Sequence, residues 1–459
     1  MIKKVVSLLM AVVLCIGVFG GCATKDSSSE QVTLEVGSWP NDSNPAEQER
    51  LMKVKEKFEA DFPNVKIVPT KWGYDVKSFL PQAASGQLPT MFRTYFTEVD
   101  RIADAGYAAD VTEYAEKHGF SAAYTDQIKD FITAEDGKQY MVANSTYAMG
   151  MALNKDLFIK AGLVNEDGSL MIPQTYEEVM EFSKIIKEKT GAYGFGMATK
   201  GNGGGWHMLN LAWSYGTVFE EKVGDEWKAK FGSQEFVDAL TWLKDMKNNG
   251  LSPDNALVGG NDLYEMFVTD RLAMMYYEPT TTALIETYAM DRNKVAFASM
   301  PAGPAGRYSQ MGGALWVISP NATPEQIDAC FNWIKYIGEG PELTDHVKET
   351  IDSKYKGYNE KGFIVGIKGL SVWNEGAEVA KYTDEVIDKY KNVDTSFYED
   401  YMDFSKVTIK AEEPVACQEL YQVISGCMQE ALTNENVDLM AVVTEAAKNF
   451  EINSLLNAE

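Results

Sequence analysis

Two neighbouring stretches of sequence, MALNKDLFIKAGL (151–163) and PQTYEEVMEFSKII (173–186), decide the fold of this chain. Residues 147–153 are small and apolar and predict a strand, and residues 154–161 predict a short helix after it. Thr175 to Glu178 has the capping-box pattern that begins a longer helix, which we expect to reach Thr190. Residues 193–198 then predict another strand. Strand and helix alternate, and this order is typical of an α/β sheet.

The same alternation precedes and follows this stretch. The sequence predicts strands at 32–36, 65–67, 91–95, 272–277, 296–300 and 313–319. Helices are expected after Asn44-Pro45 and after Thr323-Pro324, where a capping residue stands before a proline at the first helical position. The glycine-rich residues 201–205 read as a loop before a helix at 206–215. From about residue 374 the chain is predicted to be helical throughout.

Composition narrows the class of protein. The 459 residues carry a net charge of −25, which argues against binding of nucleic acid or of anionic lipid. A chain of this length exceeds one ordinary domain, so two lobes are expected. Cys417 and Cys427 would lie about 15 Å apart on one helix, too far for a disulfide. We interpret them and Cys330 as buried small residues, and no Cys/His cluster indicates zinc.

The N-terminus predicts export and anchoring. Lys3 and Lys4 precede an apolar run that ends at Gly21, so residues 1–21 are expected to be a signal peptide. Phe19-Gly20-Gly21-Cys22 resembles a bacterial lipobox, which implies cleavage before Cys22 and attachment of a lipid, with palmitate as an acyl chain, to that cysteine. Residues 22–30 would then tether the protein to the outer face of the membrane. The alternatives are a plain signal peptide and a retained anchor helix.

Four more stretches carry a family resemblance when taken in order with the first two. They are FEADFPNVKIV (58–68), AASGQLPTMF (83–92), DRLAMMYYEP (270–279) and GGALWVISP (312–320). Together they resemble the extracellular solute-binding proteins of carbohydrate ABC transporters, the maltose-binding-protein-like family. The resemblance covers nearly the whole chain after the signal peptide. It implies a monomeric binding protein that is not an enzyme, needs no cofactor and delivers its ligand to a membrane permease.

The resemblance also implies a domain organisation. The expected fold is the type II periplasmic-binding-protein fold, an α/β fold with two lobes, mixed sheets and helices on both sheet faces. Residues 31–143 and 300–345 would form lobe 1, and residues 147–297 and 350–459 would form lobe 2. Residues 144–146 and 298–300 would be the crossing strands of the hinge. Such lobes close around a ligand that contacts both of them.

Candidate ligand residues follow from the chemistry of sugars and from strand ends. Aromatic rings suit the apolar faces of a sugar, carboxylates and amides suit its hydroxyls, and ligands bind beyond the carboxyl ends of strands. The predicted ligand-binding residues are Trp39, Asn41, Asp42, Trp72, Tyr74, Tyr95, Glu98, Asn144, Ser145, Tyr147, Trp206, His207, Glu278, Thr280, Met311, Gly312 and Trp373. For each aromatic residue the alternative is packing in a core.

Other features of the sequence indicate alternative functions. Residues 200–207 are glycine-rich before a helix but lack the ending of a P-loop, so phosphate binding has little support. Asn165, Asp167 and Ser169 offer oxygen donors for calcium, with the acid at Glu177 one residue late for an EF-hand. The same fold could bind an acid sugar or a polyamine. A glycoside hydrolase would need Asp42 and Glu278 as its two carboxylates, and a surface adhesin would bind no soluble ligand.

Overall fold

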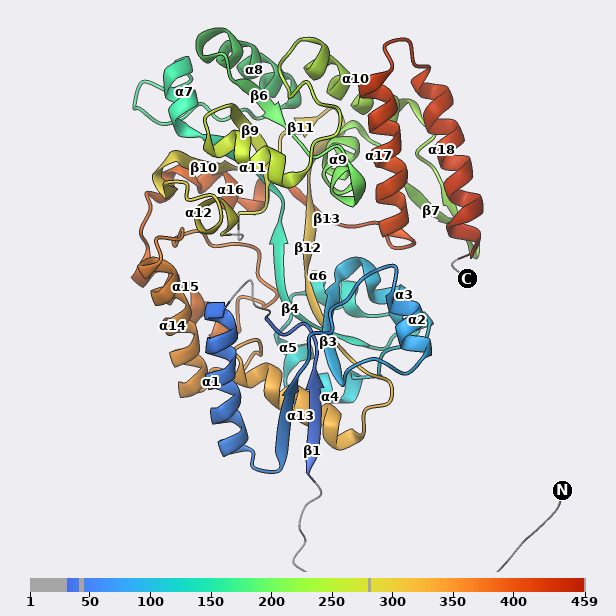
Figure 1. Ribbon diagram of the computed structural model, residues 1–459, viewed down its shortest axis with the longest axis vertical. Helices are drawn as coiled ribbons and strands as arrows, with labels where there is room; N and C mark the ends of the chain where they lie inside the picture. Colours follow the sequence, from blue (N-terminus) through green and yellow to red (C-terminus); the bar gives the residue numbers. More distant parts are fainter. Residues whose placement is uncertain (1–30, 41–44, 280–281, 458–459) are drawn as a thin grey trace, which may run out of the picture.

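The two long strands β4 (Met141–Ala148) and β12 (Gly306–Ile318) run between two lobes and pair with each other in antiparallel fashion. The computed structural model describes residues 31–40, 45–279 and 282–457. Figure 1 shows one lobe at each end of these strands. The two-lobed α/β fold with crossing strands that the sequence predicted is confirmed.

A mixed sheet in the order β11-β12-β3-β1-β2, with β4 and β13 also paired to β12, is centred in the first lobe. Its β11 end follows β12 into the second lobe, where residues 302–303 pair with residues 306–307. β1, β2 and β3 are parallel, whereas β12 runs antiparallel to β3. The strands not yet given are β1 (Val32–Val36), β2 (Val65–Pro69), β3 (Met91–Tyr95), β11 (Ala302–Gly303) and β13 (Thr408–Ala411). The helices around this sheet are α1 (Pro45–Asp61), α2 (Phe79–Ala84), α3 (Val99–Asp104), α4 (Thr112–Lys117), α5 (Phe120–Ala123), α6 (Asp126–Ile132), α13 (Pro324–Tyr336), α14 (Asp345–Glu360) and α15 (Glu378–Tyr390).

The second lobe contains a four-stranded sheet in the order β10-β5-β9-β6 and a separate hairpin of β7 and β8. Its strands are β5 (Gly150–Asn154), β6 (Tyr193–Gly196), β7 (Glu220–Val223), β8 (Glu226–Ala229), β9 (Leu272–Tyr277) and β10 (Val295–Ala298). Its helices are α7 (Lys155–Ala161), α8 (Tyr176–Thr190), α9 (Gly201–Tyr215), α10 (Gln234–Asn248), α11 (Gly260–Val268), α12 (Ala283–Glu286), α16 (Glu399–Met402), α17 (Cys417–Thr433) and α18 (Leu439–Asn453).

The strand-to-helix turn at residues 151–163 forms as predicted. Every residue of β5 is buried, because this strand lies between β9 and β10 in the sheet. The Asn154 side chain accepts a hydrogen bond from the backbone N–H of Leu157 and so caps α7. Gly162 ends that helix with a φ of 78°, a left-handed conformation that glycine adopts without steric cost.

The glycine-rich stretch differs from its prediction. Residues 201–205 are the first turns of α9 and not a loop. A Cβ atom on Gly205 would overlap the backbone of Tyr421 in α17, and one on Gly204 would lie 2.5 Å from the Ser425 hydroxyl oxygen. The glycines are therefore needed for close packing of α9 against α17, an interaction between segments about 200 residues apart that local sequence does not reveal.

The hydrophobic cores show where the chain passes from one lobe to the other. On β4, Ala143 packs in the first core and Met149, just beyond the strand, packs in the second. On β12, Met311 belongs to the first core, whereas Tyr308 packs with the second, as does Met300 in the segment before β11. The expected crossing at 298–300 is therefore wrong: residues 300–308 still pack with the second lobe, and β12 crosses beyond Tyr308.

The C-terminal third also departs from its prediction. It is not helical throughout, since β13 pairs in parallel with residues 308–311 of β12. Val372 and Trp373 pack with the core of the first lobe, and the Trp373 ring stacks on Tyr124. The predicted assignment of residues 350–459 to lobe 2 is thus not supported for α14, α15, Val372 and Trp373, which lie with lobe 1; for the other residues it stays a prediction.

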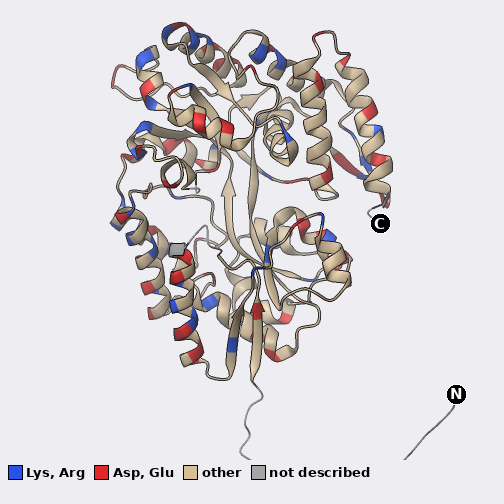
Figure 2. Ribbon diagram, viewed as in Figure 1, with Lys and Arg blue, Asp and Glu red and all other residues tan. Residues whose placement is uncertain are grey.

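Charged side chains lie mainly on the helices around the two sheets, and β4 carries none along its length (Figure 2). Among the residues that the structure describes, no helix has the length and apolar character to cross a lipid bilayer.

Candidate functional site

The first lobe contributes Tyr74, Tyr95 and Glu98 at the carboxyl ends of its strands. The Tyr74 hydroxyl donates a hydrogen bond to the Glu98 carboxylate, and the rings of Tyr74 and Tyr95 are perpendicular with centroids 5.9 Å apart. Glu98 is 1% exposed, whereas Tyr95 is 51% exposed. Parallel strands end at the same sheet edge, so the sequence rule that selected these three residues brings them together.

Tyr147 lies on the crossing strand β4, opposite Gly312 of β12. Its ring covers Gly312 so closely that any side chain at residue 312 would overlap the phenol. The Trp206 ring, from the second turn of α9, meets the Tyr147 ring edge-on at 6.4 Å. The structure therefore brings together Tyr147, Trp206 and Gly312, three predicted residues from different segments.

Carboxylates surround these rings. Glu412, between β13 and α17, accepts hydrogen bonds from Tyr421 and from Nε2 of Gln310, the latter at 2.8 Å. Burial raises the pKa of Glu412 to about 7, with the nearby charge of Glu98 adding to the increase. Burial also raises the pKa of Tyr147, and the charges of Glu412 and Glu278 raise it further.

Sequence reasoning missed Glu412. The residue stands in AEEP (411–414), which the helical interpretation of the C-terminal region placed at the start of a helix. The two adjacent acids before Pro414 are a local signal, but only the pairing of β13 with β12 places Glu412 beside Gln310.

Three predicted aromatic residues pack within the first lobe. Trp39 stacks on Trp333 of α13 with ring centroids 6.0 Å apart. Trp72 packs edge-on against Phe92 and donates its indole N–H to Gln82. Trp373 lies on Tyr124, as described above. The structure does not join any of these three to the group around Tyr147.

Two further predicted residues are buried in the cores. The His207 ring lies between Trp206, with ring centroids 5.1 Å apart, and Tyr276 in the second lobe, and its Nδ1 accepts a hydrogen bond of 2.9 Å from the backbone N–H of Ala198. Burial lowers the pKa of His207 to about 3, so the ring is neutral. Met311 is fully buried beside the crossing strands. Both side chains are therefore buried in the cores and do not offer a surface to a ligand.

The remaining predicted residues are divided between the hinge and the undescribed segments. Asn144 donates a hydrogen bond of 3.0 Å to Glu339, and Ser145 is exposed on β4. Asn41, Asp42, Thr280 and the lipidation candidate Cys22 lie outside the residues that the structure describes.

The calcium candidate forms a closed turn. The Asp167 carboxylate accepts hydrogen bonds from the backbone N–H and the hydroxyl of Ser169, at 2.9 and 2.6 Å. The Asn165 amide donates to the Ser169 hydroxyl oxygen at 2.9 Å. Within the described residues, no cluster of three or more His, Cys, Asp or Glu side chains suits a metal ion. These side chains therefore stabilise the loop, and the metal interpretation has no support in their geometry.

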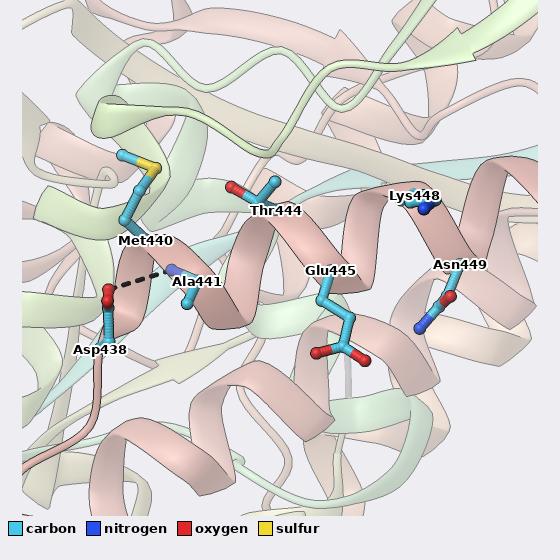
Figure 3. Close-up of a pocket in the computed structure, with 7 residues that line it drawn as sticks. All are labelled: Asp438, Met440, Ala441, Thr444, Glu445, Lys448 and Asn449. Atoms are coloured by element: carbon cyan, nitrogen blue, oxygen red, sulfur yellow. Dashed lines mark hydrogen bonds between the residues drawn. The ribbon is translucent and has the colours of Figure 1, made fainter.

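A separate surface feature lies on the outer face of α18. Figure 3 shows Met440, Thr444, Glu445 and Lys448 projecting from this one helix, which Asp438 caps. Side chains from a single helix cannot enclose a solute, so this surface is not the candidate ligand site.

The chain belongs to the bacterial extracellular solute-binding proteins, whose family model matches residues 42–336. This family consists of binding proteins and not of enzymes. A binding protein of Brucella abortus is 30% identical over 179 residues; the match covers 39% of this chain and 41% of that protein. The chain thus spans about two fifths of the length of the Brucella proteins it matches.

Solved structures share the fold over nearly the whole length. The GacH receptor of Streptomyces glaucescens, solved unliganded and with acarbose, has a TM-score of 0.67 at 19% identity, covering 92% of this chain and 98% of that one. Maltose-bound MalE3 of T. maritima has a TM-score of 0.67 at 21% identity, covering 92% and 99%. At these identities the likeness establishes the fold, and the ligands are those of the other proteins.

Proposed function

We propose that this protein captures a carbohydrate, an oligosaccharide in its preferred form, between its two lobes and delivers it to the permease of an ABC transporter. The observation that carries the proposal is the meeting of four aromatic rings with three carboxylates where the crossing strands enter the lobes. The rings are those of Tyr74, Tyr95, Tyr147 and Trp206, and the carboxylates are those of Glu98, Glu278 and Glu412.

The chemistry of this group suits a neutral polyhydroxylated ligand. The C–H faces of a sugar ring pack against indole and phenol rings, and its hydroxyls donate hydrogen bonds to carboxylates. Because the group draws on both lobes and on β4, a ligand that contacts all of it would favour the closed arrangement. Acarbose and maltose in the similar receptors support a carbohydrate, and the family supports transport.

An acid sugar is a poorer fit. Arg93 on β3 forms an ion pair of 2.5 Å with Glu339 and stacks over the Trp316 ring at 4.5 Å. Its charge is therefore already balanced within the first lobe. The carboxylates around Tyr147 favour instead a second candidate, a polyamine, whose cations would contact the same rings and acids.

We also propose that a lipid on Cys22 holds the protein at the outer face of the membrane. The lipobox-like sequence supports this anchoring. Metabolic labelling with palmitate in a bacterial host is expected to mark the native protein and to leave Cys22→Ser unmarked and released from the membrane fraction. Equal labelling of both proteins would contradict the anchor.

A ligand panel tests the binding function. Calorimetry and thermal shift with maltose, maltotriose, acarbose and spermidine should identify a ligand, since tight binding to the folded state raises Tm. Trp206→Ala is expected to weaken carbohydrate binding at least tenfold, because it removes the ring opposite Tyr147. Trp227→Ala is the matched control: Trp227 lies on the β7–β8 hairpin and should leave affinity unchanged.

The outcomes separate the alternatives. Binding of a carbohydrate that Trp206→Ala weakens and Trp227→Ala does not supports the proposal. If spermidine is the one compound of the panel that binds, the ligand class is a polyamine and not a carbohydrate. Chromatography of the same mixtures should show intact sugar, and shortened products would overturn the binding function in favour of hydrolysis.

A further inference from the structure

A continuous path of hydrogen bonds joins the two lobes beside the candidate site. Glu98 accepts hydrogen bonds from Tyr74 and from the Thr97 hydroxyl, the latter at 3.1 Å. Gln418, in the first turn of α17, donates its amide to the Thr97 hydroxyl oxygen at 3.1 Å. The Asn202 amide of α9 in turn donates to Oε1 of the Gln418 side chain at 2.7 Å. The path therefore runs from an aromatic residue of lobe 1 to the beginning of α9 in lobe 2.

Arg101 of α3 forms a second, charged link at the same place. Its Nη1 lies 3.6 Å from Oε2 of Glu98 in its own lobe and 3.7 Å from Oε1 of Glu419 in α17. The side chains of Glu98, Arg101 and Glu419 are 2%, 27% and 43% exposed. A guanidinium between two carboxylates is thus partly shielded from water, which strengthens its attraction to both.

We propose that Arg101 is a positioning residue, which holds the Glu98 carboxylate in place for a ligand and joins it to Glu419, so that ligand binding and contact between the lobes are coupled. The role at Glu98 rests on the proposed function, whereas the link between the lobes does not. A ligand hydroxyl donates more strongly to an ionised, fixed carboxylate. The charge of Arg101 favours the ionised form, because it lowers the pKa of Glu98, and it attracts the carboxylate towards α3. The same guanidinium draws the N-terminal end of α17 towards lobe 1.

The electrostatics of Glu98 agree with this geometry. Burial raises the pKa of Glu98, the hydrogen bond from Tyr74 and the charge of Arg101 lower it, and the charge of Glu419 raises it. The charge of Glu98 in turn raises the pKa of Glu412. Loss of Arg101 and loss of Glu419 should therefore shift the pKa of Glu98 in opposite directions.

The first experiment measures the Tm of the purified chain against pH, without ligand. A carboxyl with a raised pKa favours the folded state below its unfolded pKa, and this contribution is lost as pH rises through the folded pKa. Arg101→Gln should move the end of this loss in stability to higher pH, and Glu419→Gln should move it to lower pH. Arg101→Lys keeps the charge and should restore most of the native profile.

Glu98→Gln provides the control for this experiment. Both shifts should vanish in that background, because the titrating group is gone. A purely structural effect of Arg101→Gln would lower Tm equally at all pH values, and this result would overturn the positioning role.

The second experiment measures the separation of the lobes by double electron–electron resonance. Glu116→Cys on α4 and Glu445→Cys on α18 are exposed labelling sites, and Cys330, Cys417 and Cys427 are buried. On a Cys22→Ser background, Arg101→Gln and Glu419→Gln should each shift the distances to longer values, and the double variant should add little. Unchanged distances in Arg101→Gln would overturn the link between lobes.

These readouts need no ligand. A negative ligand panel together with positive pH and distance results would contradict the proposed carbohydrate but leave Arg101 as the link. Carbohydrate binding in the ligand panel, together with unchanged pH profiles of Tm and unchanged distances in the Arg101→Gln variant, would support the proposed function and overturn the role of Arg101.

Discussion

Helices α8 and α9 belong to the same lobe and have the same length, yet different information determines them. α8 begins after Thr175, whose side chain accepts the N–H of Glu178, and ends at Gly191 in a left-handed conformation. Both signals are local. α9 begins with Gly201, Asn202 and three further glycines, a composition that disfavours a helix by roughly 1 kcal/mol for each interior glycine. Its helix forms because α17 packs on those glycines.

The comparison teaches that a glycine-rich segment has two interpretations, loop or close helix contact, which the local sequence does not separate. A contact with a distant segment outweighs a poor local propensity when it buries enough surface. α17 also supplies Gln418 and Glu419 to the contacts between lobes. The packing of α9 on α17 therefore sets the position of the residues that connect the lobes.

The largest expected effect comes from adding a methyl group where the two helices touch. Gly205→Ala would overlap the Tyr421 backbone and should lower the free energy of unfolding by about 3 kcal/mol. A Cβ atom at Gly203, two residues earlier on the same helix, would have no neighbour closer than 3.9 Å. Gly203→Ala should therefore raise the free energy of unfolding by up to about 1 kcal/mol. Urea denaturation measures both. Equal effects of the two substitutions would show that α9 does not depend on close packing.

A smaller effect concerns His207, also on α9. Its folded pKa of about 3 lies below its unfolded value, so only the unfolded chain binds a proton as pH falls from about 6.5. The native protein should thereby lose about 2 kcal/mol of stability between pH 6.5 and pH 5. Asn in place of His207 keeps an acceptor for Ala198 and should remove this loss, as seen in melting curves at both pH values. An unchanged loss in this variant would show that another group, and not His207, takes up the proton on unfolding.

The smallest effect tests the local signal of α8. Thr175→Ala removes the cap of the Glu178 N–H and should cost about 1 kcal/mol. Thr175→Ser keeps the oxygen and should change stability by only a few tenths. Chemical denaturation compares the two variants. A cost for Thr175→Ser as large as that for Thr175→Ala would mean that packing of the threonine methyl, and not the cap, sets the start of α8.

In the candidate site, too, local sequence predicts some of the residues, whereas contacts with distant segments decide the others. Tyr74, Tyr95, Glu98 and Trp206 were predicted from the ends of strands, a rule that needs only the alternation of strand and helix. Trp39, Trp72 and Trp373 satisfied the same rule but pack within lobe 1, because a strand end does not say which way a side chain turns. Such orientations depend on the neighbouring segments.

The sequence by itself determined the α/β class, the family, and the helices whose caps lie within a few residues of their ends, because these depend on local patterns and on order along the chain. Only the tertiary structure decided where β12 crosses between the lobes, that residues 201–205 are helical, and that Glu412, Gln418 and Glu419 meet residues of the first lobe or the hinge. Each of these depends on contacts between segments roughly 100 or more residues apart, and their energy appears only when the segments pack together.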